Sequence, residues 1–250
     1  MDYPNRVIKE GETDQNIVIA IQQRLDELGL GPFQFSGTFG PKTKAAVKLF
    51  QSTHRDKNGV PLEMDGEIGA ITWSVLFDKS PVVVSENPPN NLLAEAIKVA
   101  KTQVGTMEEP PGSNKGVQVN KYLASVDCPP GSFWCAGFVY WCFNEAAKSL
   151  GVANPLFKTG GCLDHWNNTN GRRIKALDAA NNPSLIQAGS IFIINHGEGK
   201  GHTGIVVKED GGFIHTIEGN SNPSGSSNGI GVFELQRKII KINAGFILYE

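Results

Sequence analysis

The feature that most constrains the fold is a short stretch, SPVVVSENPPN, at residues 80–90. It contains two adjacent prolines, Pro88 and Pro89, flanked by serine and asparagine. Adjacent prolines exclude a helix and favour an extended, semi-rigid spacer. A chain of 250 residues is long enough for two domains. We therefore expect a small domain at residues 1–79, a linker at 80–90 and a larger domain at 91–250.

Composition and charge narrow the class of protein. Apolar residues make up 40% of the chain and charged residues 19%, as in an ordinary soluble globular protein. A net charge of −2 gives no strong attraction toward nucleic acid or an anionic membrane, so neither is expected as a partner. No apolar run is long enough to span a bilayer, and the polar N-terminus MDYPNRVIKEGETD does not read as a signal peptide.

All four cysteines lie in the second half of the chain, at Cys128, Cys135, Cys142 and Cys162. They form no CxxC pair, and the five histidines lack the spacing of metal ligands. We therefore expect free thiols, no metal site and no cofactor.

The first domain reads as three short helices joined by two similar turns. The helices are expected at residues 16–28, 41–51 and 68–77, from apolar residues at helical spacing. The turns GTFGPKT (37–43) and GEIGAIT (66–72) share the pattern G-x-[FI]-G-x-x-T, with the threonine inside the next helix.

These segments together resemble a known module. IQQRLDELGL, GTFGPKTKAAVKLFQ and DGEIGAITWSVLF follow in this order within about residues 13–77. The region is similar to the peptidoglycan-binding domain found beside many cell-wall hydrolases. That resemblance implies binding of the wall polymer without catalysis, and a three-helix bundle with an unrelated role is the alternative.

The second domain is expected to combine helices with an antiparallel sheet, an α+β fold. Helices are predicted at residues 91–104 and 134–150. Strands are predicted at residues 190–195, 202–208, 212–218, 229–236 and 244–249.

Two cysteines in the stretch GSFWCAGFVYWCF (131–143) have different surroundings. Cys142 lies in the middle of an apolar stripe at helical spacing, which is typical of a buried core residue. Cys135 falls in the first helical turn if Ser132 is the N-cap. Unpaired N–H groups and the helix dipole there favour a thiolate, the reactive form of cysteine. A partner base is still required.

The strand pattern selects that base. Side chains alternate across a strand, so residues that share parity share a face. If residues 210–212 form a three-residue hairpin loop, residue 209 lies opposite 213 and residue 202 opposite 220. His202, Glu218 and Asn220 then share one face, and the carboxylate fixes the tautomer of the imidazole. A four-residue loop would break this parity.

FWCAGFVYWCF, GHTGIVV and TIEGNSN, in this order, resemble the cysteine- and histidine-dependent amidohydrolase/peptidase (CHAP) family over about residues 90–250. The family implies a papain-like catalytic domain in bacterial and phage peptidoglycan hydrolases. By this resemblance Cys135 is the nucleophile, His202 the general base and then acid, and Glu218 its orienting partner. Asn220 fits a polar position two residues beyond the glutamate.

The resemblance also leaves points of difference. Many relatives carry glutamine before the nucleophile, where this chain has Trp134, so one oxyanion donor is missing from the pattern. Only Asp127 is present where some relatives bind calcium, so no calcium site is expected. We expect Trp134 and Trp166 to bind substrate, with packing of these rings as the alternative.

The resulting hypothesis is a peptidoglycan amidase or endopeptidase that cuts an amide bond of the stem peptide or cross-bridge. Without a recognisable signal peptide, release by a phage lysis route or by a secretion system is expected, with action on the cell wall. An injected antibacterial toxin would require an immunity protein as a partner. The alternatives are a non-catalytic wall-binding protein and an amidase that acts on a small peptide-like amide.

Overall fold

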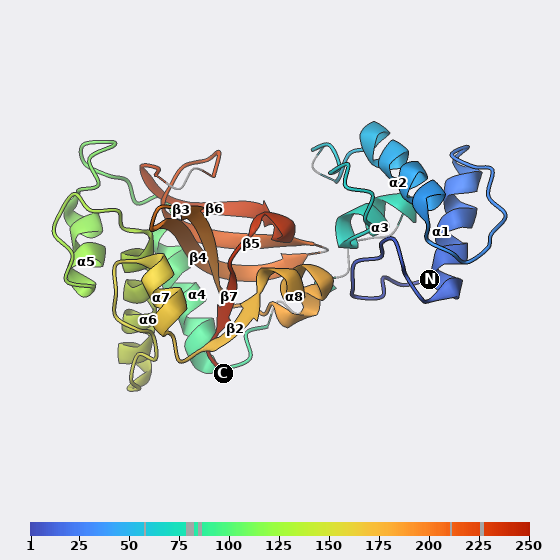
Figure 1. Ribbon diagram of the computed structural model, residues 1–250. Coiled ribbons are helices and arrows are strands. Elements are labelled where there is room, and N and C mark those ends of the chain that lie inside the picture. Colours follow the sequence, from blue (N-terminus) through green and yellow to red (C-terminus); the bar gives the residue numbers. More distant parts are fainter. Residues whose placement is uncertain (58, 79–82, 85–86, 211, 226–227) are drawn as a thin grey trace. The chain divides into compact units, whose positions relative to one another are not determined.

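The computed structural model describes residues 1–57, 59–78, 83–84, 87–210, 212–225 and 228–250 (Figure 1). The chain separates into two compact units. Met1–Val82 with the short segment Ala180–Pro183 forms the first, and Val83–Ala179 with Ser184–Glu250 forms the second. Within the described residues no helix is both long and apolar enough to cross a membrane.

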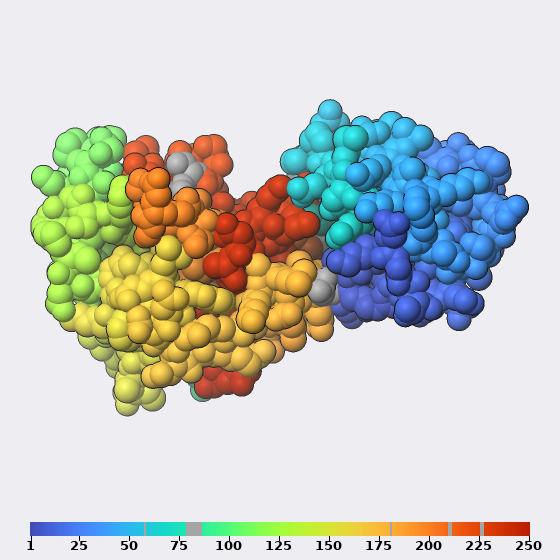
Figure 2. Space-filling model, viewed as in Figure 1, coloured from blue at the N-terminus to red at the C-terminus, as the bar shows by residue number. Residues whose placement is uncertain are grey.

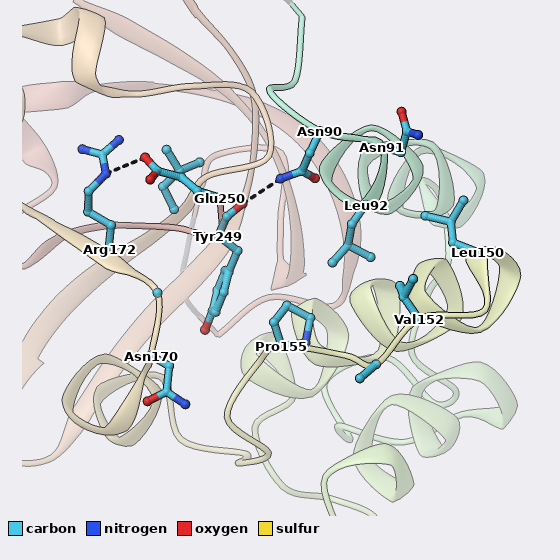
Figure 3. Close-up of a pocket in the computed structure, with 13 residues that line it drawn as sticks. Asn90, Asn91, Leu92, Leu150, Val152, Pro155, Asn170, Arg172, Tyr249 and Glu250 are labelled. Atoms are coloured by element: carbon cyan, nitrogen blue, oxygen red, sulfur yellow. Dashed lines mark hydrogen bonds and ion pairs between the residues drawn. The ribbon is translucent and has the colours of Figure 1, made fainter.

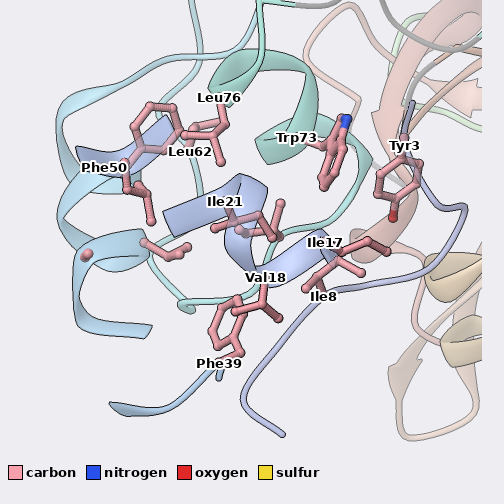
Figure 4. Packing of buried hydrophobic residues seen from close by; sticks show 14 residues of the cluster. Tyr3, Ile8, Ile17, Val18, Ile21, Phe39, Phe50, Leu62, Trp73 and Leu76 are labelled. Atoms are coloured by element: carbon pink, nitrogen blue, oxygen red, sulfur yellow. The ribbon is translucent and has the colours of Figure 1, made fainter. Parts of the chain in front are cut away.

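The N-terminal domain has three helices, α1 (Gln15–Glu27), α2 (Pro41–Thr53) and α3 (Ala70–Leu76). Helix α1 begins where the Asp14 side chain accepts hydrogen bonds from the first-turn amides, and α2 begins at a proline. A cluster of buried side chains fills the space between the helices (Figure 4). Its largest members include Ile21, Phe39, Phe50, Trp73 and Leu76.

The repeated turn pattern has a physical cause in two buried glutamines. The Gln22 side chain accepts a hydrogen bond from the Gly37 amide and donates to the Thr38 carbonyl and the Thr43 hydroxyl. One repeat later, Gln51 accepts from the Gly66 amide and donates to the Glu67 carbonyl and the Thr72 hydroxyl. Each glutamine therefore ties a glycine turn to the helix that follows it.

The C-terminal domain contains an antiparallel sheet with helices beside it. The strands run in the order β2-β7-β3-β4-β5-β6, and β1 pairs with β4. Their bounds are β1 Val83–Val84, β2 Arg172–Lys175, β3 Ile191–Gly197, β4 Lys200–Asp210, β5 Phe213–Ser221, β6 Gly231–Lys238 and β7 Gly245–Leu248. The helices are α4 Asn91–Gln103, α5 Val117–Ser125, α6 Cys135–Leu150, α7 Cys162–Asn168 and α8 Ala176–Asn181. The α+β prediction is confirmed.

Helix α6 is the centre of this domain. It contacts α4, α5 and α7 as well as strands β4 and β5. Its buried face includes Phe138, Val139, Cys142 and Phe143, so Cys142 is the core residue that its position in the stripe predicts. Helix α7, which the sequence pattern does not reveal, also packs on β3 and β4. Figure 2 shows the segment around α7, in yellow, at the surface of this domain.

The two glutamine clamps give a stability prediction. Replacing Gln51 by alanine leaves the Gly66 amide without its acceptor, which is expected to lower the free energy of unfolding by about 2–3 kcal/mol. Gln23 on α1 is exposed, so Gln23→Ala is the matched control, with an expected change within about 0.5 kcal/mol. Hydrogen exchange of peptides from residues 14–76 in the intact chain measures both. Equal protection in the two variants would contradict the clamp.

Candidate active site

Cys135 is the first residue of α6, and the turn before it sets that position. The N-cap is Trp134, which makes no side-chain capping bond. The expectation that Ser132 caps the helix is wrong, because its hydroxyl donates instead to the Pro129 carbonyl at 2.9 Å. The thiol therefore lies two positions closer to the helix end than predicted, where backbone N–H groups have no intrahelical acceptor.

His202 and Glu218 meet on neighbouring strands in the interior. The His202 Nε2 atom lies 2.8 Å from Glu218 Oε2, and both side chains are fully buried. His202 and Glu218 therefore lie on the same face of the sheet, as the alternation of side chains predicts. The turn is not as predicted, because Asp210 rather than Glu209 lies opposite Phe213. Residue 211 of the expected loop lies outside the described residues.

A β-bulge restores the register that the turn shifts. Strand β4 carries an irregularity between Val206 and Lys208, after which Val206 pairs with Thr216 and Ile205 with Ile217. A bulge adds one residue to one strand of a pair and so offsets a shift of one residue. The bulge is the reason that His202 and Glu218 share a face despite the different turn.

Two further side chains hold the Glu218 carboxylate. Arg237 of β6 donates from Nε to Oε1 at 2.6 Å and from a terminal nitrogen to Oε2 at 2.5 Å. The Thr216 hydroxyl donates to Oε1 at 2.6 Å. Burial by itself raises the pKa of Glu218, but the hydrogen bonds and charges of Arg237 and His202 lower this pKa to about 2. The carboxylate is therefore ionised and accepts hydrogen bonds only.

An ionised partner determines the tautomer of His202. Because Glu218 can only accept, the Nε2 atom of the neutral imidazole carries the proton, and Nδ1 carries the lone pair. The Nδ1 atom is buried and has no hydrogen-bond partner within the described part of the chain. A buried nitrogen with a free lone pair is poised to accept a proton.

The start of α6 is held on the same two strands. The Cys135 thiol is within hydrogen-bonding reach of the backbone amide of Thr203, the residue next to His202. Gly219, next to Glu218, has no side chain, and a Cβ there would lie 2.6 Å from Cβ of Phe138. This close approach packs the first turn of α6 against β5, on the face toward which Gly219 points, and the thiol lies beside β4, the strand that carries His202.

The Cys135 thiol differs from the readily ionised group that its helix position suggests. A hydrogen bond with Cys162, together with burial, raises the pKa of Cys135 well above its usual value. Backbone amides of Ala136 and Thr203 lower the pKa, but by less. At rest the group is therefore a neutral thiol, and its proton must pass to a base before the sulfur can act as a nucleophile.

Asn220 is buried and supports the start of α6 instead of contacting His202. Its side-chain oxygen accepts from the Trp134 amide at 3.3 Å, and its nitrogen donates to Asn114 and to the Gly229 carbonyl, both at 3.0 Å. The buried Glu108 carboxylate accepts from the Trp134 indole N–H at 2.8 Å. The expected substrate contact of Trp134 is therefore wrong, because its ring is fully buried and its N–H is engaged.

Trp166, in contrast to Trp134, is partly exposed and lies beside the β3–β4 hairpin. It is half-buried on α7 and lines a pocket of about 630 Å³. The pocket is also lined by Leu163, Asn167, Asn195, His196, Gly197, Asn243 and Ala244. Asn195 pairs with Gly201, the residue before His202, so the pocket begins one step from the histidine. Partial burial and the charges of His202 and Arg237 lower the pKa of His196.

A larger pocket, about 950 Å³, lies near the C-terminus (Figure 3). It is lined by apolar side chains such as Leu92, Leu150 and Val152, and by an ion pair between Arg172 and Glu250. None of the residues that hold the Cys135–His202 site contributes to it. Within the described residues, no group of three or more His, Cys, Asp or Glu side chains could hold a metal ion.

A cysteine at a helix N-terminus and a buried histidine–carboxylate pair on the strands that this helix contacts are the groups that a cysteine-dependent hydrolase uses. Comparison with family models identifies both domains. Residues 128–220 match the CHAP domain, and residues 14–76 match a peptidoglycan binding domain. The chain thus carries a CHAP domain behind a peptidoglycan binding domain, and the two support a peptidoglycan hydrolase that acts on the cell wall. No curated protein and no solved structure matches the chain.

Sequence reasoning missed Arg237, Glu108 and Cys162. Each is distant in sequence from the residue it contacts, so no local pattern reveals it. Arg237 lies 19 residues from Glu218, and Glu108 lies 26 residues from Trp134. One signal could have pointed to Arg237. A buried carboxylate needs a charged or hydrogen-bonding partner, and the strand that follows Glu218 could supply one on the same face of the sheet.

The Arg237–Glu218 pair predicts a specific pH dependence. The folded pKa of Glu218, about 2, lies below its usual 4.5, so its stabilising contribution is present above pH 4.5. That contribution, on the order of 3 kcal/mol, is lost as the pH falls from 4.5 toward 2. Arg237→Met should lower the free energy of unfolding at pH 7 by about 3–5 kcal/mol and flatten this acid dependence.

Denaturant unfolding at a series of pH values measures both effects. Arg172→Met removes an exposed ion pair with Glu250 and is the matched control, with an expected change below about 1 kcal/mol. An acid dependence in Arg237→Met as steep as that of the wild type would refute the role of the pair.

Proposed function

We propose that the protein hydrolyses an amide bond of peptidoglycan, in the stem peptide or the cross-bridge, with Cys135 as the nucleophile. The observation that carries this proposal is the buried His202–Glu218 pair, which has an unpartnered Nδ1 and lies on the two strands that the helix beginning at Cys135 contacts. A nucleophile, a base and an orienting carboxylate in one site are the groups that acyl transfer requires.

The proposed reaction has two halves. In the first, His202 Nδ1 takes the thiol proton as the Cys135 sulfur attacks the carbonyl carbon of the scissile amide. The imidazolium, stabilised by Glu218, then gives this proton to the leaving amine, and a thioester remains. In the second half His202 takes a proton from water, which attacks the thioester carbonyl. The C–S bond then breaks, and the imidazolium returns the proton to the leaving Cys135 sulfur, so the product acid is released and the thiol is restored. The Cys135 backbone N–H is the proposed oxyanion donor, since first-turn amides lack intrahelical acceptors.

We propose that the Trp166 pocket holds part of the substrate next to the scissile bond. An indole face surrounded by amide and imidazole groups suits a neutral polar ligand, and His196 is uncharged near neutral pH because its pKa is lowered. The peptidoglycan binding domain would keep the catalytic domain at the wall. A phage-type lysin and a secreted antibacterial toxin both fit these features, and the toxin would require an immunity protein.

Removal of the nucleophile tests the reaction. Cys135→Ala is expected to lower the rate of peptidoglycan digestion by about 10⁴-fold or more, because no other group forms the thioester. Cys128→Ala, which removes a half-buried thiol outside the site, is the control and should digest at the wild-type rate. Both variants should still sediment with insoluble peptidoglycan. Wild-type digestion by Cys135→Ala would exclude the mechanism.

The products distinguish the remaining alternatives. Mass spectrometry of the soluble fragments identifies the bond that is cut. An intact polymer with turnover of small amides would indicate an amidase of small peptide-like substrates. An intact polymer without any turnover would indicate a wall-binding protein.

Loss of the indole tests the pocket. Trp166→Ala is expected to reduce kcat/KM for soluble peptidoglycan fragments roughly tenfold or more, since a substrate-stacking aromatic carries much of the local binding energy. Trp166→Phe keeps an aromatic face and should recover most of the activity. The rate at which a small thiol reagent labels Cys135 should be unchanged in both variants. Full activity of Trp166→Ala would remove the pocket from the proposal.

A further inference from the structure

A second thiol lies against the proposed nucleophile and has no part in the reaction above. Cys162 is the first residue of α7, as Cys135 is the first residue of α6, and the two helices contact each other. The two side chains share a hydrogen bond, and both cysteines are free. Their exposed fractions are 5% and 6%, so only a small edge of each residue is accessible.

The strand that carries His202 makes room for this second thiol. Gly201 has no side chain, and a Cβ at this position would lie 2.7 Å from the Cys162 sulfur. Helix α7 is held in place farther along by His165, whose Nε2 lies 2.8 Å from the Tyr249 hydroxyl. Burial lowers the pKa of His165 to about 4, so this contact is between neutral groups near neutral pH. The neighbourhood of the two sulfurs is therefore built into the packing.

The shared hydrogen bond makes the two thiols chemically unequal. Hydrogen bonding to Cys135 lowers the pKa of Cys162, while the same bond raises the pKa of Cys135. Two cysteine side chains in hydrogen-bonding contact are the arrangement from which an oxidised sulfur is captured by its neighbour.

We infer that Cys135 and Cys162 form an oxidative modification site, in which a hydroperoxide converts the two thiols into an intramolecular disulfide. One thiolate attacks the peroxide oxygen, the O–O bond breaks, and a sulfenic acid and hydroxide form. The second thiol then attacks the sulfenic sulfur, the S–S bond forms, and the hydroxyl leaves as water. The two thiols supply two electrons and two protons, and hydrogen peroxide becomes two waters.

The disulfide blocks the proposed nucleophile and protects it. While Cys135 is bonded to Cys162, it cannot attack an amide, and it cannot proceed to the irreversible sulfinic and sulfonic acids. Formation of the bond does not depend on what the protein hydrolyses. Only the loss of activity rests on the proposed function, so the two inferences can fail separately.

In the test, the intact wild-type chain is treated with hydrogen peroxide and its free thiols are then blocked. The peptides are mapped by mass spectrometry without reduction. The expected product is a peptide pair joined through Cys135 and Cys162, with Cys128 and Cys142 still free. Lytic activity should fall roughly tenfold or more and should return after treatment with dithiothreitol. A protein with no lytic activity before oxidation would refute the proposed function and leave the peptide map decisive for the disulfide.

Variants distinguish disulfide formation between Cys135 and Cys162 from general oxidation of the cysteines. In Cys162→Ser and Cys162→Ala, peroxide should convert Cys135 to sulfinic or sulfonic acid, and dithiothreitol should no longer restore activity. Cys128→Ser is the matched control, because its thiol lies outside the pair, and it should behave as the wild type. The inference is overturned if oxidised wild-type protein carries sulfenic, sulfinic or sulfonic acid at Cys135 without the disulfide. A bond from Cys162 to Cys128 would overturn it as well.

Discussion

Arg237 holds both oxygens of Glu218 at a place that water does not reach, and the geometry of the site depends on that pair. A buried carboxylate without such a partner would take up a proton and become a hydrogen-bond donor as well as an acceptor. The tautomer of His202 would then no longer be fixed, and Nδ1 would not be left with its lone pair. Arg237 also lies over the Phe192 ring, 5.5 Å from its centroid, so an aromatic face covers one side of the cation.

A second polar cluster positions Cys135 independently of the first. Glu108 and Asn220 hold Trp134 through its indole N–H and its backbone amide, and Trp134 is the residue from which α6 begins. A fully buried tryptophan there fixes the helix end by packing, and no side-chain cap is needed. Trp134 stands where the family resemblance leads one to expect glutamine, and in this chain that position supports the helix.

The sequence pattern predicted most elements because their burial is periodic, and it predicted the His202–Glu218 pair because parity is local to two strands. The predicted turn is wrong, and the bulge has no signal in the sequence. The two shift the register by one residue in opposite directions, so the predicted pairing is still correct at His202 and Glu218. Ser132 failed as a cap because its hydroxyl found a nearer carbonyl. Arg237, Glu108 and Cys162 were missed because only the packed fold brings them to their partners. Residue type alone does not separate substrate contact from packing at Trp134, because it does not distinguish a buried ring from an exposed one.

The buried state of Cys135 changes how the proposed chemistry should be understood. A resting thiolate would react with many electrophiles and would leave His202 protonated before substrate arrives. A neutral thiol keeps the nucleophile inactive until its proton moves to Nδ1, and that proton is the one the leaving amine then needs. The buried thiol ionises in the same proton transfer that forms the imidazolium, and Glu218 stabilises this imidazolium. In this scheme the ionised Glu218, held by Arg237, compensates for the raised pKa of Cys135.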